Sequence, residues 1–298
     1  MIDIVTLGTG GPVPTKDRCL SSIVFKFEAE TFLLDCGENT QQNIQKYYNH
    51  FFIDNIIISH RHLDHFGGLY GYLSTMSLWG RTKKLNIYLP KNFKDFHQNL
   101  ESNNIKLKYS VNIICYDEST ILKFEKFVIS FFKREHSILT YGTSIKILEK
   151  YKMDPEKLKK IKNKQLISKL QKGIAVIEED KILYPINFAL EYLKEFYIIY
   201  SSDGLLMPES FFKEKKIAVL LHEGTYPSRE VSLAKEHKHT AISEINKLSK
   251  LVNKIFIIHI GPKVLKYKEK LQENVSFSED GLHIIIDNAG NTIINSKV

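Results

Sequence analysis

The sequence is poor in cysteine, and its few cysteines lie far apart. Among 298 residues only Cys19, Cys36 and Cys115 occur, and no C-x-x-C spacing is present. An odd and sparse set excludes the disulfide framework of small secreted proteins. It also excludes a structural zinc site built from cysteine pairs. We therefore expect three free thiols in a reducing compartment.

Long apolar runs are missing as well. No stretch approaches the roughly 20 apolar residues that a membrane-spanning helix requires. Residues 1–6 lack the basic start and the small-residue cleavage site of a secretory signal. No G-x-G-x-x-G pattern opens a helix, which argues against a dinucleotide-binding fold. These absences predict a soluble, cytoplasmic protein.

Apolar residues and strand-like runs are sufficient for a sizeable α/β core. Hydrophobic residues make up 43% of the chain. Expected strands span 2–7, 23–27, 31–36, 56–59, 85–89, 196–201, 217–221, 255–260 and 282–287, with further strands between 111 and 148. Expected helices span 39–48, 69–79 and 240–251, and an apolar stripe on the second places Tyr72 and Trp79 in the core. Strands followed by helices in both halves predict an α/β sandwich with helices on its outer faces.

Positive charge is concentrated in one segment. The chain has 42 basic and 34 acidic residues, a net charge of +8 that suits a polyanion partner and equally a lysine-rich genome. Residues 150–172 hold nine lysines and two acidic residues. Asp154 and Pro155 predict a helix start there, and Gly173 predicts its end. Because residues 150–173 have too few apolar positions for a core, we expect them to form a protruding basic arm.

Four ligand-type side chains, those of His60, His62, Asp64 and His65, follow one apolar strand directly. Burying them unpaired in an apolar core would cost several kcal/mol. Their spacing allows the first two to face one metal ion and the last two to face another. Neutral imidazole and carboxylate suit zinc, with iron or manganese as alternatives.

Three further ligand-type residues, His136, Asp203 and His259, stand at the ends of other expected strands. A carboxylate such as that of Asp203 can bridge two ions about 4 Å apart, which suits an in-line displacement at phosphorus. Together the seven residues predict a two-metal hydrolytic site.

The H-x-H-x-D-H run after a strand resembles the signature of the metallo-β-lactamase fold, and the chain is more closely similar to the ribonuclease Z family of tRNA 3′-processing endonucleases. The resemblance rests on four further features: residues 8–10 with 14–18, residues 34–41, the His222–Glu223–Gly224–Thr225 element, and the position of the basic segment. It implies a four-layer αβ/βα sandwich. It also implies an exosite for precursor tRNA at residues 150–173, and a homodimer.

The resemblance also implies a role for each ligand-type residue. One metal ion would be held by His60, His62, His136 and Asp203. A second would be held by Asp64, His65, Asp203 and His259. The two ions, expected as Zn²⁺, would activate water for attack on phosphorus, and Asp64 would orient that water or accept its proton.

A histidine paired with Glu223 would help to protonate the leaving 3′ oxygen. Two histidines are candidates. His237 fits the family's distance to the last metal ligand, whereas His239 fits the distance from the element that contains Glu223. We prefer His237, because a helix tolerates gaps less well than the loop before it.

Substrate contacts are expected from six basic residues, in the opening loop, after the last ligand and in the basic segment: Lys16, Arg18, Lys263, Lys157, Lys159 and Lys160. The sequence also departs from the family pattern. Lys263 replaces an arginine and supplies a point charge instead of a bidentate fork. Cys19 replaces an asparagine, Ser202 replaces the glycine before Asp203, and the basic segment lacks a Gly-Pro turn.

The expected function is removal of the 3′ trailer from precursor tRNA by a metal-dependent endonuclease. One alternative is a hydrolase of the same fold that acts on a small phosphodiester or thioester. Another is an RNA-binding protein with a decayed site. A flavin-linked relative of the fold is disfavoured, because no flavin module follows and the ligand set is rich in histidine.

Overall fold

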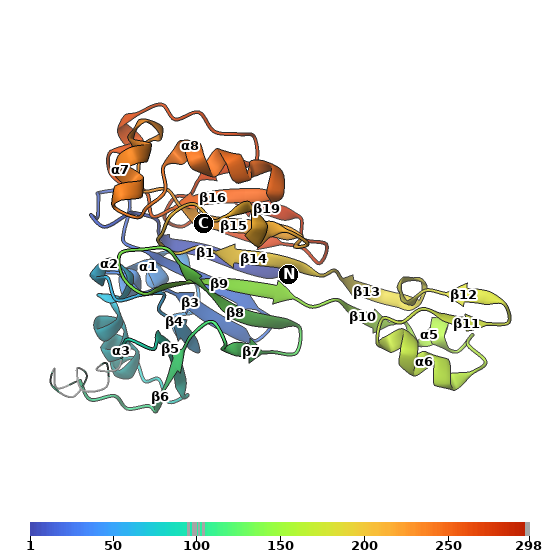
Figure 1. Cartoon of the computed structure of the whole chain (residues 1–298). Coiled ribbons are helices and arrows are strands. Elements are labelled where there is room, and N and C mark those ends of the chain that lie inside the picture. Colours follow the sequence, from blue (N-terminus) through green and yellow to red (C-terminus); the bar gives the residue numbers. More distant parts are fainter. Residues whose placement is uncertain (94–95, 97–99, 101, 103–104, 296–298) are drawn as a thin grey trace.

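Two β-sheets packed face to face form the body of the protein, and a long projection leaves one end of it (Figure 1). The computed structural model describes residues 1–298 except 94–95, 97–99, 101, 103–104 and 296–298. None of the described helices has the length and apolarity to span a bilayer.

The first sheet has eight strands within the described residues, in the order β19-β18-β1-β2-β3-β4-β5-β6. Its strands β3 to β6 run parallel to one another, and the remaining neighbours are antiparallel. The strands are β1 (Ile2–Gly8), β2 (Ser22–Phe27), β3 (Glu30–Leu34), β4 (Asn55–Ile57), β5 (Leu85–Pro90), β6 (Val111–Tyr116), β18 (His283–Ile286) and β19 (Thr292–Asn295).

The second sheet has seven strands in the described part of the chain, in the order β17-β16-β15-β14-β9-β8-β7. Strands β14 to β17 are parallel, and β8 runs in the same direction because β9 is antiparallel to both β8 and β14. The strands are β7 (Ile121–Lys123), β8 (Phe127–Arg134), β9 (Thr140–Ile147), β14 (Phe196–Tyr200), β15 (Ile217–Glu223), β16 (Lys254–Ile258) and β17 (Val275–Phe277).

Aromatic and β-branched side chains fill the space between the sheets. Phe25 and Phe32 of the first sheet meet Phe127 of the second, with ring centroids 5.8 and 6.0 Å apart. Helices α1 (Thr40–Tyr47) and α3 (Leu69–Leu78) cover the outer face of the first sheet. Helix α8 (Ile242–Ile245) covers that of the second. The result is the four-layer sandwich that was expected.

Short helices complete the body. These are α2 (Leu63–Phe66), α7 (Val231–Glu236) and the 3₁₀ turns Glu209–Phe212, Ser228–Glu230, Asn246–Leu251 and Val264–Lys266. A single helix was expected over 240–251. The structure instead has the short α8, and the second half of the expected helix is a 3₁₀ turn. Tyr72 is buried as expected, but Trp79 is 55% exposed because it lies just beyond the last turn of α3.

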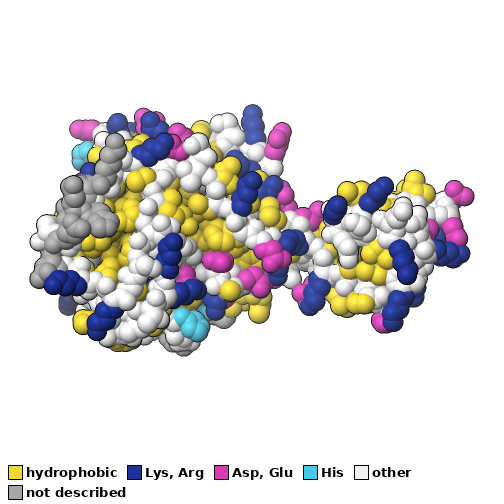
Figure 2. Space-filling model, turned by 90° about the horizontal axis from the view of Figure 1, so that it is seen from below, with side chains coloured by type: hydrophobic (Ala, Val, Ile, Leu, Met, Phe, Trp, Pro, Cys, Tyr) yellow, Lys and Arg dark blue, Asp and Glu magenta, His cyan; other side chains and the backbone are white. Residues whose placement is uncertain are grey.

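The projection, residues 150–193 and called the arm from here on, begins and ends as a two-stranded stalk. Strand β10 (Lys150–Met153) pairs antiparallel with β13 (Ala189–Leu193). Between them lie α5 (Pro155–Leu158), α6 (Lys164–Gln171), β11 (Val176–Glu178), β12 (Lys181–Leu183) and the 3₁₀ turn Pro185–Phe188. Figure 2 shows this tip as a separate lobe on a narrow neck.

The tip of the arm has a small core of its own. Ile161, Leu170 and Val176 are buried together there, against partly buried neighbours. The carboxylate of Asp154 accepts hydrogen bonds from the backbone N–H groups of Glu156 and Lys157, which caps α5 as expected. The basic segment 150–173 is thus the first part of a longer unit, and its apolar residues pack with those of 174–193 instead of with the body.

Candidate metal centre

The seven ligand-type side chains meet at one edge of the sandwich. His136, Asp203 and His259 follow β8, β14 and β16, whose carboxyl ends lie at the same edge because these strands run in one direction. His60 and His62 follow β4 of the first sheet, and α2 carries the remaining two, Asp64 and His65.

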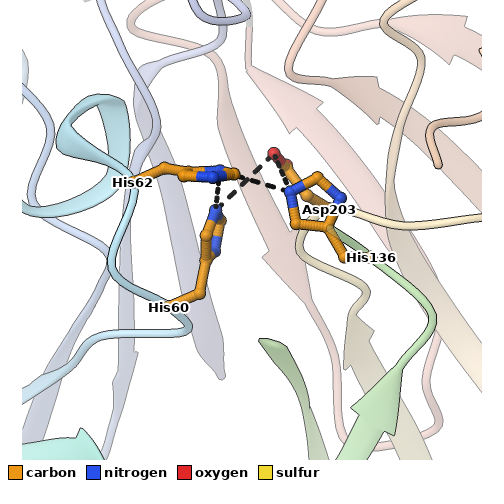
Figure 3. A group of neighbouring side chains, drawn as sticks. All are labelled: His60, His62, His136 and Asp203. Carbon is orange, nitrogen blue, oxygen red and sulfur yellow. Dashed lines mark hydrogen bonds and ion pairs between the residues drawn. The ribbon is translucent and has the colours of Figure 1, made fainter. Parts of the chain in front are cut away.

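The first group of ligand-type atoms comes from His60, His62, His136 and Asp203, which point toward one another (Figure 3). Nδ1 of His62 lies 3.1 Å from Nε2 of His60 and 3.2 Å from Nε2 of His136. Oδ2 of Asp203 lies 3.8 Å from the first of these Nε2 atoms and 3.9 Å from the second.

The second group comes from Asp64, His65, Asp203 and His259, and it uses the same Oδ2 of Asp203. This oxygen lies 3.3 Å from Nε2 of His65 and 3.5 Å from Nε2 of His259. Oδ2 of Asp64 lies 3.5 and 3.1 Å from the same two nitrogens. One carboxylate oxygen therefore belongs to both groups.

These spacings fit divalent cations. Ligand atoms about 2.1 Å from a common centre lie about 3.4 Å apart in a tetrahedron. Among the described residues, Nε2 of His65 and Oδ1 of Asp203 are buried polar atoms without a hydrogen-bond partner. Burial also lowers the pKa of His60 well below its ordinary value, which keeps the imidazole neutral and able to donate a lone pair. The donor set indicates divalent-metal binding.

The carboxylate of Asp35 orients His65 directly and His60 through Ser59, a role that the sequence did not reveal. Its Oδ2 lies 2.7 Å from Nδ1 of His65 and accepts hydrogen bonds from the hydroxyls of Ser59, at 2.8 Å, and Tyr200. Its Oδ1 accepts from the backbone N–H of Ser59 at 2.6 Å. The Ser59 hydroxyl in turn lies 2.9 Å from Nδ1 of His60. Such partners fix the orientation of metal-binding imidazoles.

Hydrogen bonds fix the conformation of the turn that carries Asp203. Ser202 before it has φ 55°, a left-handed conformation at the position where the family pattern has glycine. The next residue, Gly204, has φ 145°; its N–H donates to Oε1 of Glu223 at 3.1 Å, and its carbonyl accepts from the Thr240 hydroxyl at 2.8 Å. The buried guanidinium of Arg134 donates to the carbonyl of residue 205 at 2.6 Å. These contacts fix the carboxylate that both groups share.

Glu223 pairs with His239, whereas the sequence argument preferred His237. Nδ1 of His239 lies 2.8 Å from Oε1 of Glu223, and its ring lines the pocket at the cluster. His237 directly follows α7 and is exposed. Its ring contacts the Tyr226 hydroxyl instead of Glu223. The preference assumed an unbroken spacing to the last ligand. The chain instead turns back after α7, where Lys238 has φ 56°, and brings the second histidine to Glu223.

The contact between Glu223 and His239 favours the ionised form of both groups. Burial opposes the charge on both groups, but each supports the ionised form of the other. The facing His239 lowers the pKa of Glu223, and the carboxylates of Glu223 and Asp203 raise that of His239 to about 9.

The expected substrate contacts differ in their accessibility. Arg18 is buried, and its guanidinium donates to the hydroxyl of Thr9 at 2.6 Å and to the carbonyl of Ser278, so it holds the opening loop from inside. Lys16 is exposed. Lys263 is also exposed, with Nζ 3.4 Å from Oε2 of Glu230. In the arm, Lys159 and Lys160 are exposed and Lys157 is partly buried.

An open pocket of about 480 Å³ leads to the cluster. Its lining combines four ligand-type residues with the apolar side chains of Pro12 and Leu63, together with Arg61 and His239. Leu63 is 71% exposed. The pocket size suits a nucleotide-sized group.

Comparisons with known proteins agree with this arrangement. A family model described as Anti-Pycsar protein Apyc1 matches residues 2–284. Ribonuclease Z of Methanocaldococcus jannaschii is 33% identical over 300 residues, which cover 96% of this chain and 95% of the relative.

Solved structures share the architecture. The short form of human tRNase Z superposes with a TM-score of 0.68 at 24% identity and covers 96% of this chain and 99% of its own. The metallo-β-lactamase fold protein YhfI of Bacillus subtilis gives 0.65 at 16% identity, with 95% and 98% covered. The metallo-β-lactamase fold expected from the sequence is thereby confirmed.

Proposed function

Because the chain belongs to the ribonuclease Z family and to that of the Anti-Pycsar protein Apyc1, we propose that it is a metal-dependent endoribonuclease of precursor tRNA. It hydrolyses a phosphodiester at the 3′ end and removes the trailer. The observation that carries this proposal is the pair of four-residue groups that share Oδ2 of Asp203.

The groups suit two Zn²⁺ ions per subunit, with Mn²⁺ or Fe²⁺ as alternatives. His60, His62, His136 and Asp203 would hold one ion, and Asp64, His65, Asp203 and His259 would hold the other. Two such ions lower the pKa of a water molecule and neutralise charge that develops on the phosphate.

Two side chains handle protons in this proposal. Asp64 lines the pocket, and its carboxylate orients the attacking water. His239, with Nδ1 on Glu223, keeps Nε2 for the leaving 3′ oxygen, to which it donates a proton. The ionised Glu223 favours the imidazolium that this donation requires.

The chain is one domain over 1–298 in this proposal, with the basic segment 150–173 as part of an inserted tRNA-binding exosite. Lys16, Lys263 and the arm residues Lys157, Lys159 and Lys160 are side chains that can neutralise phosphates without reading bases. We place the protein in the cytoplasm as a homodimer. Light scattering coupled to size-exclusion chromatography tests the dimer.

The direct test is incubation of the purified protein with an end-labelled precursor tRNA, with and without a chelator. We expect a single cut at the start of the 3′ trailer, which disappears with the chelator and returns with added Zn²⁺ or Mn²⁺. Metal-loaded protein that leaves the RNA intact would refute the proposal. Hydrolysis of bis(p-nitrophenyl) phosphate without RNA cleavage would favour a small-substrate phosphodiesterase.

A further inference from the structure

The hydroxyl of Thr225 lies between the metal cluster and the Glu223–His239 pair. Thr225 follows β15 and is buried. Its Oγ1 is 2.7 Å from Oε2 of Glu223 and 2.8 Å from Nδ1 of His259. It is also 3.3 Å from Nδ1 of His239. Among the described residues, no other hydroxyl contacts both His259 and Glu223.

The donors and acceptors in this group can be assigned from chemistry. A carboxylate only accepts, so at 2.7 Å the Thr225 hydroxyl donates its single proton to Glu223. The carbonyl of His259 is a competing acceptor at 3.3 Å, but the shorter contact to a charged group is the stronger one. With its proton committed, Oγ1 accepts from His259, and Nδ1 of that ring must therefore carry the hydrogen.

This assignment fixes the other side of the ring. In the neutral imidazole that binds a metal ion, a hydrogen on Nδ1 leaves the lone pair on Nε2, which faces the carboxylate oxygens of Asp64, at 3.1 Å, and Asp203, at 3.5 Å. A lone pair that faces two carboxylate oxygens is stable only with a cation among them. The hydroxyl thus sets the tautomer in which His259 can bind a metal ion.

We propose that Thr225 is a positioning residue that holds His259 in its metal-binding tautomer and links the second metal position to Glu223. This inference rests on the proposed function only in treating His259 as a metal ligand. Glu223 would then serve two neighbours at once, His239 through Oε1 and His259 through Thr225 and Oε2. The Thr225 hydroxyl and Glu223 therefore connect the metal ligand His259 with the proton-donating His239.

The test compares Thr225→Val, which keeps the side-chain shape but cannot accept a hydrogen bond, with Thr225→Ser, which keeps the hydroxyl. We expect the valine variant to lose about 10–100-fold in affinity for one of two Zn²⁺ ions, measured by chelator competition. Its Co²⁺-substituted form should show altered ligand-field bands. Thr225→Ser should restore both signals to within about threefold of wild type, because the hydroxyl alone makes the hydrogen bond that orients the ring.

A matched control is Thr6→Val. Thr6 is also buried, and its hydroxyl donates to the carbonyl of Glu279 at 2.6 Å, outside the cluster. This variant should lose stability but keep both metal affinities and the Co²⁺ spectrum. If Thr225→Val does not fold, Thr225→Ala removes the same acceptor with less bulk, and the same shifts are expected.

Unchanged metal affinity and spectrum in the folded valine or alanine variant would overturn the proposal, as would a wild-type protein that binds no metal ion. A serine variant that behaves like valine would overturn it too, because shape instead of the hydroxyl would then matter. These readouts need no RNA. Wild-type protein that binds two ions yet leaves precursor tRNA uncut would refute the proposed function while the Thr225 result stands by itself.

Discussion

Replacing Asp35 with asparagine should cost the protein both stability and metal affinity. The carboxylate accepts hydrogen bonds from the backbone and hydroxyl of Ser59, from Nδ1 of His65 and from the Tyr200 hydroxyl. An amide offers one acceptor oxygen, so one buried donor must face an NH₂ group. An unsatisfied donor costs about 1–3 kcal/mol, and a lost hydrogen bond to a charged group costs about 1.5–3 kcal/mol.

We therefore expect Asp35→Asn to lower the free energy of unfolding by about 3–5 kcal/mol, measured by urea titration of the metal-free protein. We also expect Zn²⁺ affinity to fall by about 10–100-fold, because His65 and His60 lose the groups that orient them. Chelator competition measures this loss.

Asp280 provides the control for this experiment. It is also buried, and it accepts hydrogen bonds from the backbone and hydroxyl of Thr9 and from the backbone of Cys19, outside the cluster. Asp280→Asn should destabilise the fold and leave Zn²⁺ affinity unchanged. Equal metal affinities in wild type and Asp35→Asn would refute the reasoning, as would equal losses in the two variants.

Three further sets of substitutions test catalysis, substrate binding and packing separately. His239→Ala should lower kcat on precursor tRNA by about 10²–10⁴-fold, whereas His237→Ala should stay near wild type; similar losses in both would contradict the pairing with Glu223. Neutralising three arm lysines should raise KM for precursor tRNA and reduce its salt dependence, with hydrolysis of bis(p-nitrophenyl) phosphate unchanged; three exposed body lysines serve as the matched control. The arm set is Lys157, Lys159 and Lys160, and the control set is Lys213, Lys247 and Lys250, all changed to glutamine. Gly224→Ala, which adds a single methyl group, should lower stability by about 1–3 kcal/mol in thermal unfolding, because its Cβ would lie 2.5 Å from Cγ2 of Ile257.

The ligand-type residues could be found from the sequence because their signal is local. His60, His62 and their two neighbours fall within six positions, and the remaining three stand at strand ends where the chain must turn. The strands that deliver them were expected because they are apolar runs of strand length. The structure brings all seven together.

The supporting groups could not be found in the same way, because they act through contacts between distant segments. Asp35 and Thr225 lie in motifs that were noticed, yet nothing in the spacing shows which nitrogen each of them faces. Arg18 looked like a surface cation, and only the folded loop shows it buried beside Thr9. The choice between His237 and His239 depended on one reversal of the chain after α7.

The extent of the arm was missed for a compositional reason. Its first half is marked by lysines, whereas its second half, residues 174–193, has four acidic residues and one lysine and resembles ordinary loop and strand. The core of the arm draws residues from both halves. Leu170 and Val176, one from each half, are buried only because the two halves fold onto each other.

The two-stranded stalk is the part of the arm that attaches to the body. Its two strands join the lobe to the sandwich, and the base is braced by ion pairs such as Lys150 with Glu125, at 2.9 Å, and Lys152 with Glu191, at 2.7 Å. Exposed pairs of this kind weaken as ionic strength rises. A change in ionic strength therefore acts on the base of the arm, whereas the ligand-type residues at the edge of the sandwich are mostly buried and are screened less.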